Sequence, residues 1–353
     1  TRDYRELVDA SHRENLLLHH FSIGSKASRT AYALPDRMAL IYHNITPPEY
    51  FVGVHRPLAR QCFRGRRELR AYIDRCELAL GDSEFNRQDL EALGFTRTAV
   101  LPVVPDFAHL DCGGNPFVAE QFDDEWTNIL FVGRVIANKK IEDVIRAFHA
   151  YQRLFNPRSR LLIVGVFSLF ERYLASLQHL VHALDLTDVH FTGHVSDEEL
   201  VAYYEIADLF LCASEHEGFC VPIVEAFYMG VPVLAYAATA VPATMDGGGI
   251  LFSDKDPREV AALMDAVLSD SRLMESILQR QTDAVHRLRT KDFAGTLLGF
   301  VDDILARPRR GHCRVVFDFW QQFDTAQSLE ALRQVRPSLF KALPGDDETS
   351  RGR

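Results

Sequence analysis

Short apolar runs alternate along the chain with longer segments in which apolar residues recur every three or four positions. The short runs fit strands that are buried on both faces, and the longer segments fit helices that bury one face. Because this alternation is typical of a parallel sheet covered by helices on both sides, the pattern predicts an α/β protein.

Two strands are predicted in the first part of the chain, over residues 15–22 and 38–46, and each carries histidine near its carboxyl end. A helix is predicted to begin after Ser83, which suits an N-cap, and to end before Gly94. Prolines and glycines interrupt residues 98–116, which we interpret as a linker between domains.

The second part of the chain is more regular. Strands are predicted over residues 128–133, 160–165, 189–193, 208–214 and 232–237. Helices are predicted over residues 141–155, 168–184, 196–207 and 221–230. This alternation predicts a doubly wound domain, in which ligands bind at the carboxyl ends of the strands. We therefore expect a first domain with its linker (1–118), a second domain (119–300), and a helical extension with a disordered polar tail (301–353).

Composition limits the function. The chain has 353 residues, 47% of them hydrophobic, which is enough for two cores. A formal net charge of -10 disfavours a general nucleic-acid binder, because neutralising phosphates requires a basic surface. The six cysteines form no C-x-x-C pair, which favours reduced thiols and a cytoplasmic protein without a metal cluster. No apolar run is long enough to cross a bilayer. The sequence starts at Thr1 within a charged helical pattern, so whether a segment precedes Thr1 in the native protein is left open.

The first candidate for chemistry is a basic loop at a strand end. Gly133 ends a predicted strand, Arg134 follows directly, and Lys139 and Lys140 precede the next helix. A guanidinium fork and an ammonium at the carboxyl edge of a sheet suit a bound diphosphate. Solvated basic residues in an ordinary loop remain the alternative.

The second candidate follows the strand over residues 208–214. The turn that starts at Glu217 leads into a helix beginning near Val221, whose free backbone N–H groups and dipole form an anion site. Glu217 is expected at the rim of that site and Glu225 about one turn deeper, where carboxylates accept hydrogen bonds from hydroxyls. The alternatives are helix capping for Glu217 and a solvated helix face for Glu225, while Glu215 is interpreted as a solvated loop residue.

The third candidate is a set of histidines at strand ends, His19, His20 and His43. If two domains face one another across a cleft, these side chains point into it and can hydrogen-bond a reacting sugar or an acceptor. A structural role remains open for each of them.

A basic helix is predicted from Arg56 onward, up to Leu80. One face of this segment carries Leu58, Cys62, Leu69, Ile73 and Cys76, and the arginines Arg60, Arg64, Arg67 and Arg75 fall largely elsewhere. The segment from Arg56 to Arg75 can dock on an anionic membrane surface, at the inner face of the membrane. An ordinary surface helix that packs on the sheet is the alternative.

Three segments follow one another along the chain: GRVIANKK, GHVSDEELVAYYEIADLFLCASEHEGFCVPIVEAFYMGVPVLAY and GGGILFSDKDPREVAALMDAVLSD. In this order they resemble the nucleotide-sugar-binding domain of the retaining GT-B glycosyltransferases of family 4, over residues 128–288. The segment LGDSEFNRQDLEALGFTRTAVLPVVPDF resembles their first domain, and IYHNITPPEYF resembles bacterial mannosyltransferases of surface-polysaccharide assembly. The resemblance implies two Rossmann-like doubly wound domains that face each other across a cleft.

The resemblance also implies roles for the candidates. Arg134 and Lys139 would hold the diphosphate of the donor and stabilise charge on the leaving nucleotide. Glu217 would bind hydroxyls of the donor sugar, and Glu225 would bind the ribose hydroxyls. The histidine near the donor sugar would be His20, with His19 in reserve. Other substrate-binding positions would be Gly133, Gly218, Phe219, Cys220, Val221 and His43. Such enzymes need no metal ion and no cofactor beyond the nucleotide sugar.

Two departures from the family pattern stand out. Nothing before Leu16 resembles the opening strand and glycine-rich loop of the family, so the first domain is interpreted as incomplete. Cys220 stands where many relatives have glycine, and we expect it to crowd the diphosphate loop.

The function implied is transfer of a hexose, mannose in particular, from a nucleotide diphosphate sugar to a hydroxyl acceptor with retention of configuration, in glycan or glycolipid synthesis. GDP-mannose is the favoured donor, and a UDP-sugar remains open. The alternatives are a GT-B phosphorylase and a catalytically silent nucleotide-sugar-binding subunit.

Overall fold

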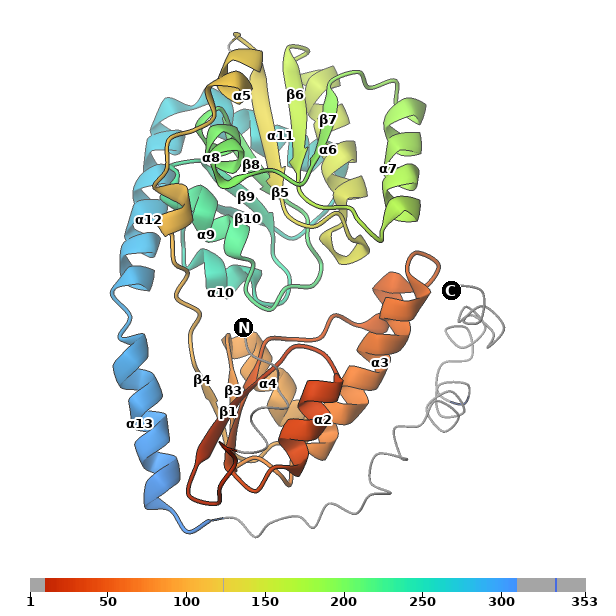
Figure 1. The fold of residues 1–353 in the computed structure, drawn as a ribbon. Helices are drawn as coiled ribbons and strands as arrows, with labels where there is room; N and C mark the ends of the chain where they lie inside the picture. Colours follow the sequence, from red (N-terminus) through yellow and green to blue (C-terminus); the bar gives the residue numbers. More distant parts are fainter. Residues whose placement is uncertain (1–9, 123, 310–333, 335–353) are drawn as a thin grey trace. The chain divides into compact units, whose positions relative to one another are not determined.

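The computed structural model describes residues 10–122, 124–309 and 334, and it divides the chain into two compact units (Figure 1). Unit 1 combines the described residues up to Val103 with those from Asp292 onward, and unit 2 comprises residues from Val104 to Lys291. Each unit is built on a parallel sheet with helices, so the predicted α/β class is confirmed.

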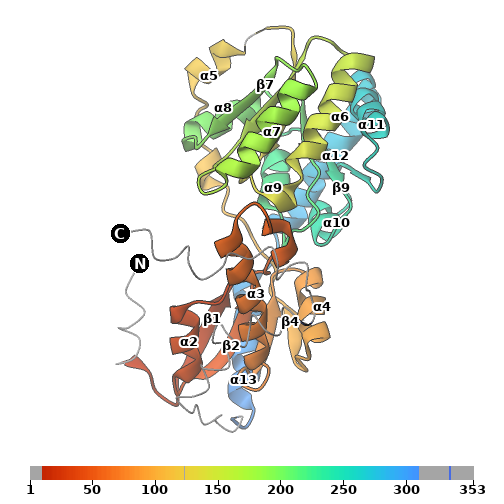
Figure 2. The ribbon, with the colours of Figure 1, turned by 90° about the vertical axis from the view of Figure 1, so that its right-hand side faces the viewer.

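Unit 1 contains a parallel sheet with the strand order β1-β2-β3-β4. Its strands are β1 (Leu16–Phe21), β2 (Arg37–Tyr42), β3 (Leu78–Gly81) and β4 (Thr98–Val100). Its helices are α2 (Lys26–Ala33), η1 (Pro48–Phe51), α3 (Arg56–Ala71), α4 (Glu84–Leu93) and α13 (Phe293–Ala306). The helices α2 and α3 cover one face of this sheet and α13 covers the other (Figures 1 and 2).

The contact between α13 and the sheet of unit 1 explains why two distant chain segments form one unit. Ile304 of α13 is fully buried against Ala39, Ile41 and Leu80 of the central strands. The buried guanidinium of Arg37 also donates to the backbone carbonyls of Ile304 and Arg307. Apolar burial and these two hydrogen bonds therefore fix α13 to the sheet.

Unit 2 contains a six-stranded parallel sheet with the order β10-β9-β8-β5-β6-β7. Its strands are β5 (Thr127–Val132), β6 (Ser159–Val164), β7 (Val189–Gly193), β8 (Leu209–Cys212), β9 (Val233–Tyr236) and β10 (Ile250–Phe252). The chain adds β6 and β7 on one side of β5 and then crosses to place β8 on the other side. The switch point of the topology therefore lies between β5 and β8, where ligands bind in open α/β sheets.

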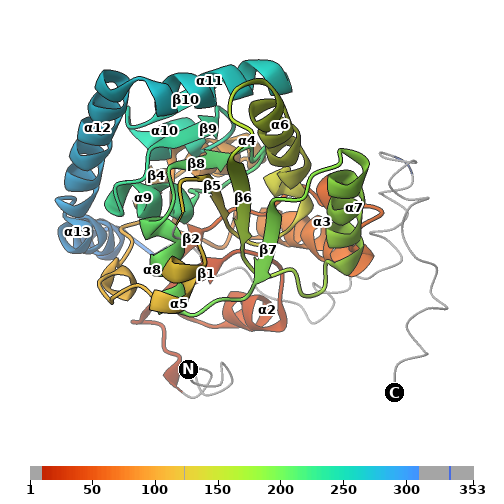
Figure 3. The same ribbon diagram turned by 90° about the horizontal axis from the view of Figure 1, so that it is seen from above.

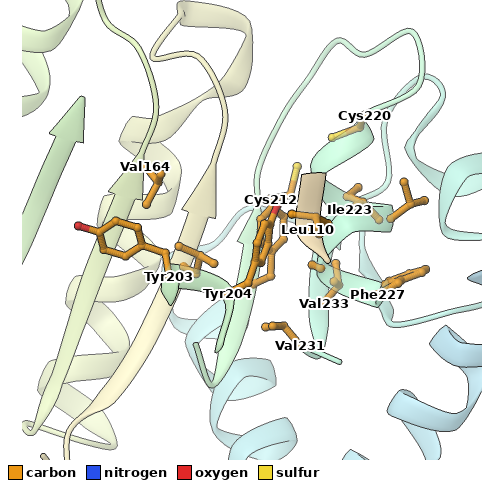
Figure 4. Packing of buried hydrophobic residues seen from close by; sticks show 14 of the residues in the cluster. Leu110, Val164, Tyr203, Tyr204, Cys212, Cys220, Ile223, Phe227, Val231 and Val233 are labelled. Atoms are coloured by element: carbon orange, nitrogen blue, oxygen red, sulfur yellow. The ribbon is translucent and has the colours of Figure 1, made fainter. Parts of the chain in front are cut away.

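Helices cover both faces of the six-stranded sheet (Figure 3). They are η2 (Ala108–Leu110), α5 (Pro116–Gln121), η3 (Ala137–Lys139), α6 (Ile141–Leu154), α7 (Glu171–Ala183), α8 (Asp197–Glu205), α9 (Val221–Tyr228), α10 (Val241–Met245), α11 (Pro257–Ser269) and α12 (Ser271–Arg289). The core cluster on one face joins α8, α9 and α12 to the strands, and Ile223 and Phe227 of α9 lie in it (Figure 4). This packing fixes the start of α9 at the edge of the sheet.

The local signals in the sequence are largely confirmed. Ser83 caps α4, Gly94 ends it in the left-handed conformation, and Ser196 with Glu199 forms the capping box of α8. The predicted helix from Arg56 to Leu80 is wrong in its second half, because α3 ends at Ala71 and the chain turns into β3.

The predicted linker at residues 98–116 begins with a strand, β4, and the short strand β10 was missed. The contacts place the boundary after Val103, where the sequence interpretation placed it after residue 118. They also assign α13 to unit 1, whereas the sequence interpretation divided it between the second domain and the extension. The predicted polar tail lies outside the described residues.

Candidate functional site

A buried ion pair lies at the switch point of unit 2. Lys139 follows β5 and Glu217 follows the neighbouring strand β8, and Nζ of Lys139 donates to Oε1 of Glu217 at 2.5 Å. The two side chains are only 13% and 9% exposed. Burial is the largest influence on the pKa of Lys139 and lowers it, but the charge and hydrogen bond of Glu217, together with the nearby Cys220 and Cys212, raise the pKa overall. Lys139 therefore stays charged, and two of its three N–H donors are not used by Glu217.

Further bonds tie together the two loops that carry this pair. The backbone N–H of Glu215 donates to the carbonyl of Asn138 at 2.9 Å, and the Asn138 side chain donates to the carbonyl of His216 at 3.0 Å. Glu215 also pairs with Lys255 at 3.0 Å, so the interpretation of Glu215 as a solvated loop residue is wrong. These bonds hold both loops, and with them Lys139 and Glu217, in one arrangement.

Glu217 does not cap the helix that follows it. The N-cap position of α9 is Cys220, and within the described part of the chain no side chain caps the first turn of that helix. The side chain of Glu217 is bonded to Lys139, and its backbone N–H donates to Thr239 at 2.9 Å. In the first turn of α9, Pro222 has no N–H group and the N–H of Ile223 donates to the carbonyl of Cys220 at 3.2 Å, so the N–H of Val221 is the first-turn donor that can face a ligand.

Cys220 adopts a left-handed backbone conformation, with φ 78. Glycine takes this conformation without cost, whereas a residue with a Cβ atom loses about 1–2 kcal/mol. This turn therefore explains why glycine suits the position in the family that the sequence resembles. The Cys220 side chain itself is 7% exposed and packs in the core cluster of unit 2 (Figure 4).

Arg134 is exposed directly after Gly133, where the backbone has φ 150. Its guanidinium lies over the ring of Phe170, 5.5 Å from the ring centroid. A stacked guanidinium keeps its planar N–H fork free at the edges, which suits a phosphate.

Glu225 of α9 is the centre of a buried polar cluster. Tyr204 of α8 donates to Oε2 at 3.0 Å, and Nε2 of His109 lies 3.2 Å from Oε1. Glu225 is 8% exposed, so the alternative of a solvated helix face is wrong. A carboxylate has about four acceptor sites, and two neighbours leave capacity for a ligand hydroxyl. His109 and Tyr204 were not singled out from the sequence, because neither has a strand-end position or a motif that marks it.

The candidate histidines lie in unit 1, at the carboxyl edge of its sheet. Nδ1 of His20 lies 2.7 Å from Nε2 of His43, and Nδ1 of His43 lies 3.3 Å from Asp82, which sequence analysis missed. Asp82 directly follows β3, and this strand-end position was the signal that could have found it.

His19 belongs to a different environment. Its ring stacks on Tyr72 with the ring centroids 5.5 Å apart. Burial, followed by the charges of His20 and Arg75, lowers the pKa of His19 to about 4. These contacts favour a structural role for His19 over substrate binding.

The basic segment from Arg56 to Arg75 is only partly a free surface. Arg75 is 6% exposed, and its guanidinium donates to the backbone carbonyls of Tyr32, Leu34 and Asp36 at 2.8–3.0 Å. Arg75 therefore cannot contact a membrane without breaking these bonds. Among the described residues, no helix is long and apolar enough to cross a membrane, and no group of three or more histidine, cysteine or acidic side chains could hold a metal ion.

Comparison with known proteins gives a consistent picture. Residues 117–283 match the family described as Glycosyl transferases group 1. The chain is 28% identical over 145 residues to the serotype-specific mannosyltransferase WbdA of Escherichia coli, covering 40% of this chain and 17% of WbdA. It is 25% identical over 242 residues to the O-antigen chain mannosyltransferase B of Escherichia coli, covering 66% of this chain and 61% of that protein. The chain therefore spans less than two thirds of the length of these relatives.

Solved structures match over more of the chain. Sucrose-phosphate synthase from Thermosynechococcus elongatus has a TM-score of 0.68 at 18% identity, covering 86% of this chain and 76% of that one. Anabaena HepE in complex with UDP and glucose also has a TM-score of 0.68 at 18% identity, covering 85% and 81%. These likenesses confirm the predicted GT-B fold class, with a parallel α/β sheet in each of the two units.

Proposed function

We propose, from the membership of residues 117–283 in the glycosyl transferases group 1 family, that this protein is a glycosyltransferase that moves a hexose from a nucleotide diphosphate sugar to a hydroxyl acceptor. The acceptor belongs to glycan or glycolipid synthesis, and transfer retains the configuration of the sugar. The observation that carries this proposal is the buried pair of Lys139 and Glu217 at the switch point of unit 2.

In this proposal Lys139 and Glu217 bind different parts of the donor. The N–H donors of Lys139 that Glu217 leaves unused bind the diphosphate, and they stabilise the negative charge that develops on the leaving nucleotide. The second oxygen of Glu217 accepts from hydroxyls of the donor sugar. A carboxylate held by a neighbouring ammonium is a poor nucleophile, and the departing phosphate oxygen takes the proton of the acceptor hydroxyl.

The surrounding groups complete the donor site of unit 2. Arg134 offers a guanidinium fork to the diphosphate, and the N-terminus of α9 adds the backbone N–H of Val221. Glu225, supported by Tyr204 and His109, binds the ribose hydroxyls. In this proposal Val221, at the start of α9, faces the diphosphate, and Glu225, about one turn later, faces the ribose.

Mannose is the hexose we propose, with GDP-mannose as donor and without a metal ion. The likeness to two mannosyltransferases supports mannose, whereas the HepE structure contains UDP and glucose. The protein acts in the cytoplasm, and among the arginines of α3 the exposed Arg70 is the one placed to contact the inner membrane face.

A screen of donor hydrolysis and transfer with GDP-mannose, UDP-glucose and other nucleotide sugars tests the proposal. We expect release of GDP from GDP-mannose, at an undiminished rate when EDTA is added, and an α-linked product. Formation of a glycosyl phosphate from a glycan and free phosphate, with the shortened glycan released and no nucleotide present, would identify a phosphorylase. Tight nucleotide binding in calorimetry, with no turnover of any donor, would identify a silent binding subunit.

A further inference from the structure

The carboxyl ends of three neighbouring strands in unit 1 bring two histidines and an aspartate into one row. His20 lies in β1, His43 follows β2, and Asp82 follows β3. The planes of the two imidazole rings differ by only 8°, and their centroids are 5.0 Å apart. The N–N distance of 2.7 Å is shorter than the separation of stacked rings, so the rings meet edge to edge through a hydrogen bond in their common plane.

The inner end of this row is fixed. Asp82 is 7% exposed, and its second carboxylate oxygen accepts from the side chain of Asn86, which is fully buried. Asn86 in turn accepts from the side chain of Asn44 at 2.6 Å. The backbone N–H of His43 donates to Phe21 of β1 at 3.0 Å, which holds the histidine in place beside the strand. Asp82 is therefore anchored on one side and faces His43 on the other.

The hydrogen bonds determine which nitrogen atoms carry protons. An ionised carboxylate only accepts, so the Nδ1 atom of His43 donates to Asp82. The Nε2 atom of a neutral His43 is then an acceptor, and Nδ1 of His20 must donate to it. The Nε2 atom of His20 consequently carries a lone pair at the outer end of the row. Burial and the neighbouring His43 lower the pKa of His20, which keeps its ring neutral at neutral pH.

We propose that Asp82 is a positioning residue that sets the tautomers of His43 and His20, so that the exposed His20 presents Nε2 as a hydrogen-bond acceptor for a carbohydrate hydroxyl. This inference rests on the proposed glycosyl transfer for the identity of its ligand. An acceptor atom at this edge selects a group that donates hydrogen, such as a sugar hydroxyl, and disfavours a phosphate oxygen. The hydroxyl belongs either to the donor sugar or to the acceptor molecule.

The variant Asp82→Asn tests the proposal because it can reverse the donor and acceptor roles in each hydrogen bond from residue 82 to His20. Its amide oxygen can turn to Asn86 and its NH₂ group can then donate to Nδ1 of His43, which would move the protons so that His20 carries hydrogen on Nε2. Two-bond ¹H–¹⁵N spectra of the full chain report the protonated nitrogen of each ring, with His20→Gln and His43→Gln used for assignment. We expect hydrogen on Nδ1 of both rings in the wild type and on Nε2 of both in Asp82→Asn.

The spectra decide the tautomer without any assay of activity. Hydrogen on Nε2 of His20 in the wild type, or identical tautomers in wild type and Asp82→Asn, would overturn the proposal. Asp89→Asn is the matched control, because Asp89 pairs with Tyr42 and Arg66 outside the row. We expect the wild-type tautomers in that variant.

Kinetics then identify the hydroxyl. We expect kcat/KM to fall about tenfold in Asp82→Asn and to stay near the wild-type value in Asp89→Asn, since the O–H of the ligand would lose its acceptor at His20 and the hydroxyl would have to turn to accept from the new N–H. A fall in donor hydrolysis assigns the hydroxyl to the donor sugar, and a fall in transfer alone assigns it to the acceptor. Unchanged hydrolysis and transfer despite reversed tautomers contradicts the role of His20.

Failure of the proposed function would look different. A wild-type protein that turns over no nucleotide sugar would refute the glycosyltransferase proposal, while the spectra would still report the tautomers. In that case the Nε2 resonance of His20 is followed during addition of GDP-mannose and of free mannose. A shift supports hydroxyl binding at His20, and an unmoved resonance with both sugars overturns it.

Discussion

Among single residues, Lys139 gives the sharpest prediction. Its ammonium group is buried with Glu217 at the switch point, where negative charge on the leaving diphosphate would develop. Replacing Lys139 by Met should lower kcat by about a hundredfold or more, because fixed donors act most strongly on charge formed in the transition state. Steady-state kinetics with the donor identified in the screen measure this change.

Two controls separate chemistry from folding in that experiment. Lys139→Met leaves Glu217 buried without its partner, so the double variant Lys139→Met/Glu217→Gln restores a neutral site. Lys255→Met removes another paired lysine, 18% exposed, whose bond to Glu215 supports the loop of Glu217, so this variant measures the effect of weaker loop support alone. Wild-type turnover in a folded Lys139→Met protein would refute the role of Lys139.

His19 predicts how the stability of unit 1 depends on pH. Its pKa is about 4 in the folded protein and 6.5 in the unfolded chain, so the unfolded chain binds more protons between these values. Stability therefore rises with pH through this window and is lost as the pH falls below 6.5. From pH 7.5 to pH 5 the loss due to His19 should be about 2 kcal/mol.

The variant His19→Phe keeps a ring against Tyr72 and removes the titration. Urea unfolding at pH 7.5 and pH 5, monitored by a probe in unit 1, should show a smaller loss of stability for this variant than for the wild type. Equal losses in the two proteins would contradict a neutral, buried His19.

Sequence reasoning located the charged candidates but not their partners. Lys139 and Glu217 could be found because each follows a recognisable strand, and strand ends meet at one edge of a parallel sheet. The partners His109 and Tyr204 come from other elements, so their approach to Glu225 depends on tertiary packing. Strand alternation alone places His19 and His20 on opposite faces of β1, but tertiary packing decides that His19 meets Tyr72 and His20 meets His43.

At the scale of elements, the turn into α9 predicts that a glycine variant is more stable than an alanine variant, which is the reverse of the usual order. Cys220 has φ 78, so glycine should be tolerated there better than alanine, although both remove the same buried sulfur atom. We expect Cys220→Gly to be more stable than Cys220→Ala by about 1 kcal/mol. Urea denaturation midpoints of the two variants measure the difference.

Cys212 provides the opposite case within the same core. It lies in strand β8 and is as well buried as Cys220, at 2% and 7% exposure. Here Cys212→Ala should be more stable than Cys212→Gly by about 0.5–1 kcal/mol, because glycine weakens a strand. The same order of stability at both positions would contradict the backbone explanation.

The elements that the sequence predicted least well are the short ones. The strands β4 and β10 each have three residues and lie beside prolines or glycines, so their local signal is that of a loop. They form strands because each hydrogen-bonds to a neighbour in the sheet, β3 or β9. Pairing of this kind is set by the fold of the unit and not by the three residues themselves.

For the whole molecule, α13 should determine the stability of unit 1. Ile304→Asp would place a charge among Ala39, Ile41 and Leu80, and we expect this to destabilise unit 1 by several kcal/mol. Hydrogen exchange in β2 and β3 should accelerate, while exchange in β5 of unit 2 should stay unchanged. The neighbouring Leu305 is 50% exposed, so Leu305→Asp is the control and should leave both units unaffected.

The sequence alone could not assign α13 to unit 1. The apolar pattern of residues 293–306 predicts a helix that needs a partner, but it does not say which sheet provides it. The buried Arg37 gives the answer through its bonds to Ile304 and Arg307, more than 260 positions later in the chain. A contact of that separation leaves no local signal.

The insertion of unit 2 between two segments of unit 1 has a consequence for synthesis on the ribosome. The sheet of unit 1 is translated early, yet the helix that buries Ala39, Ile41 and Leu80 follows only after the whole of unit 2. Unit 2 can therefore complete its fold while one face of the older sheet is still exposed. During that interval the nascent protein presents an apolar surface, and a chaperone that binds such surfaces would engage the first-made unit for longer than the second.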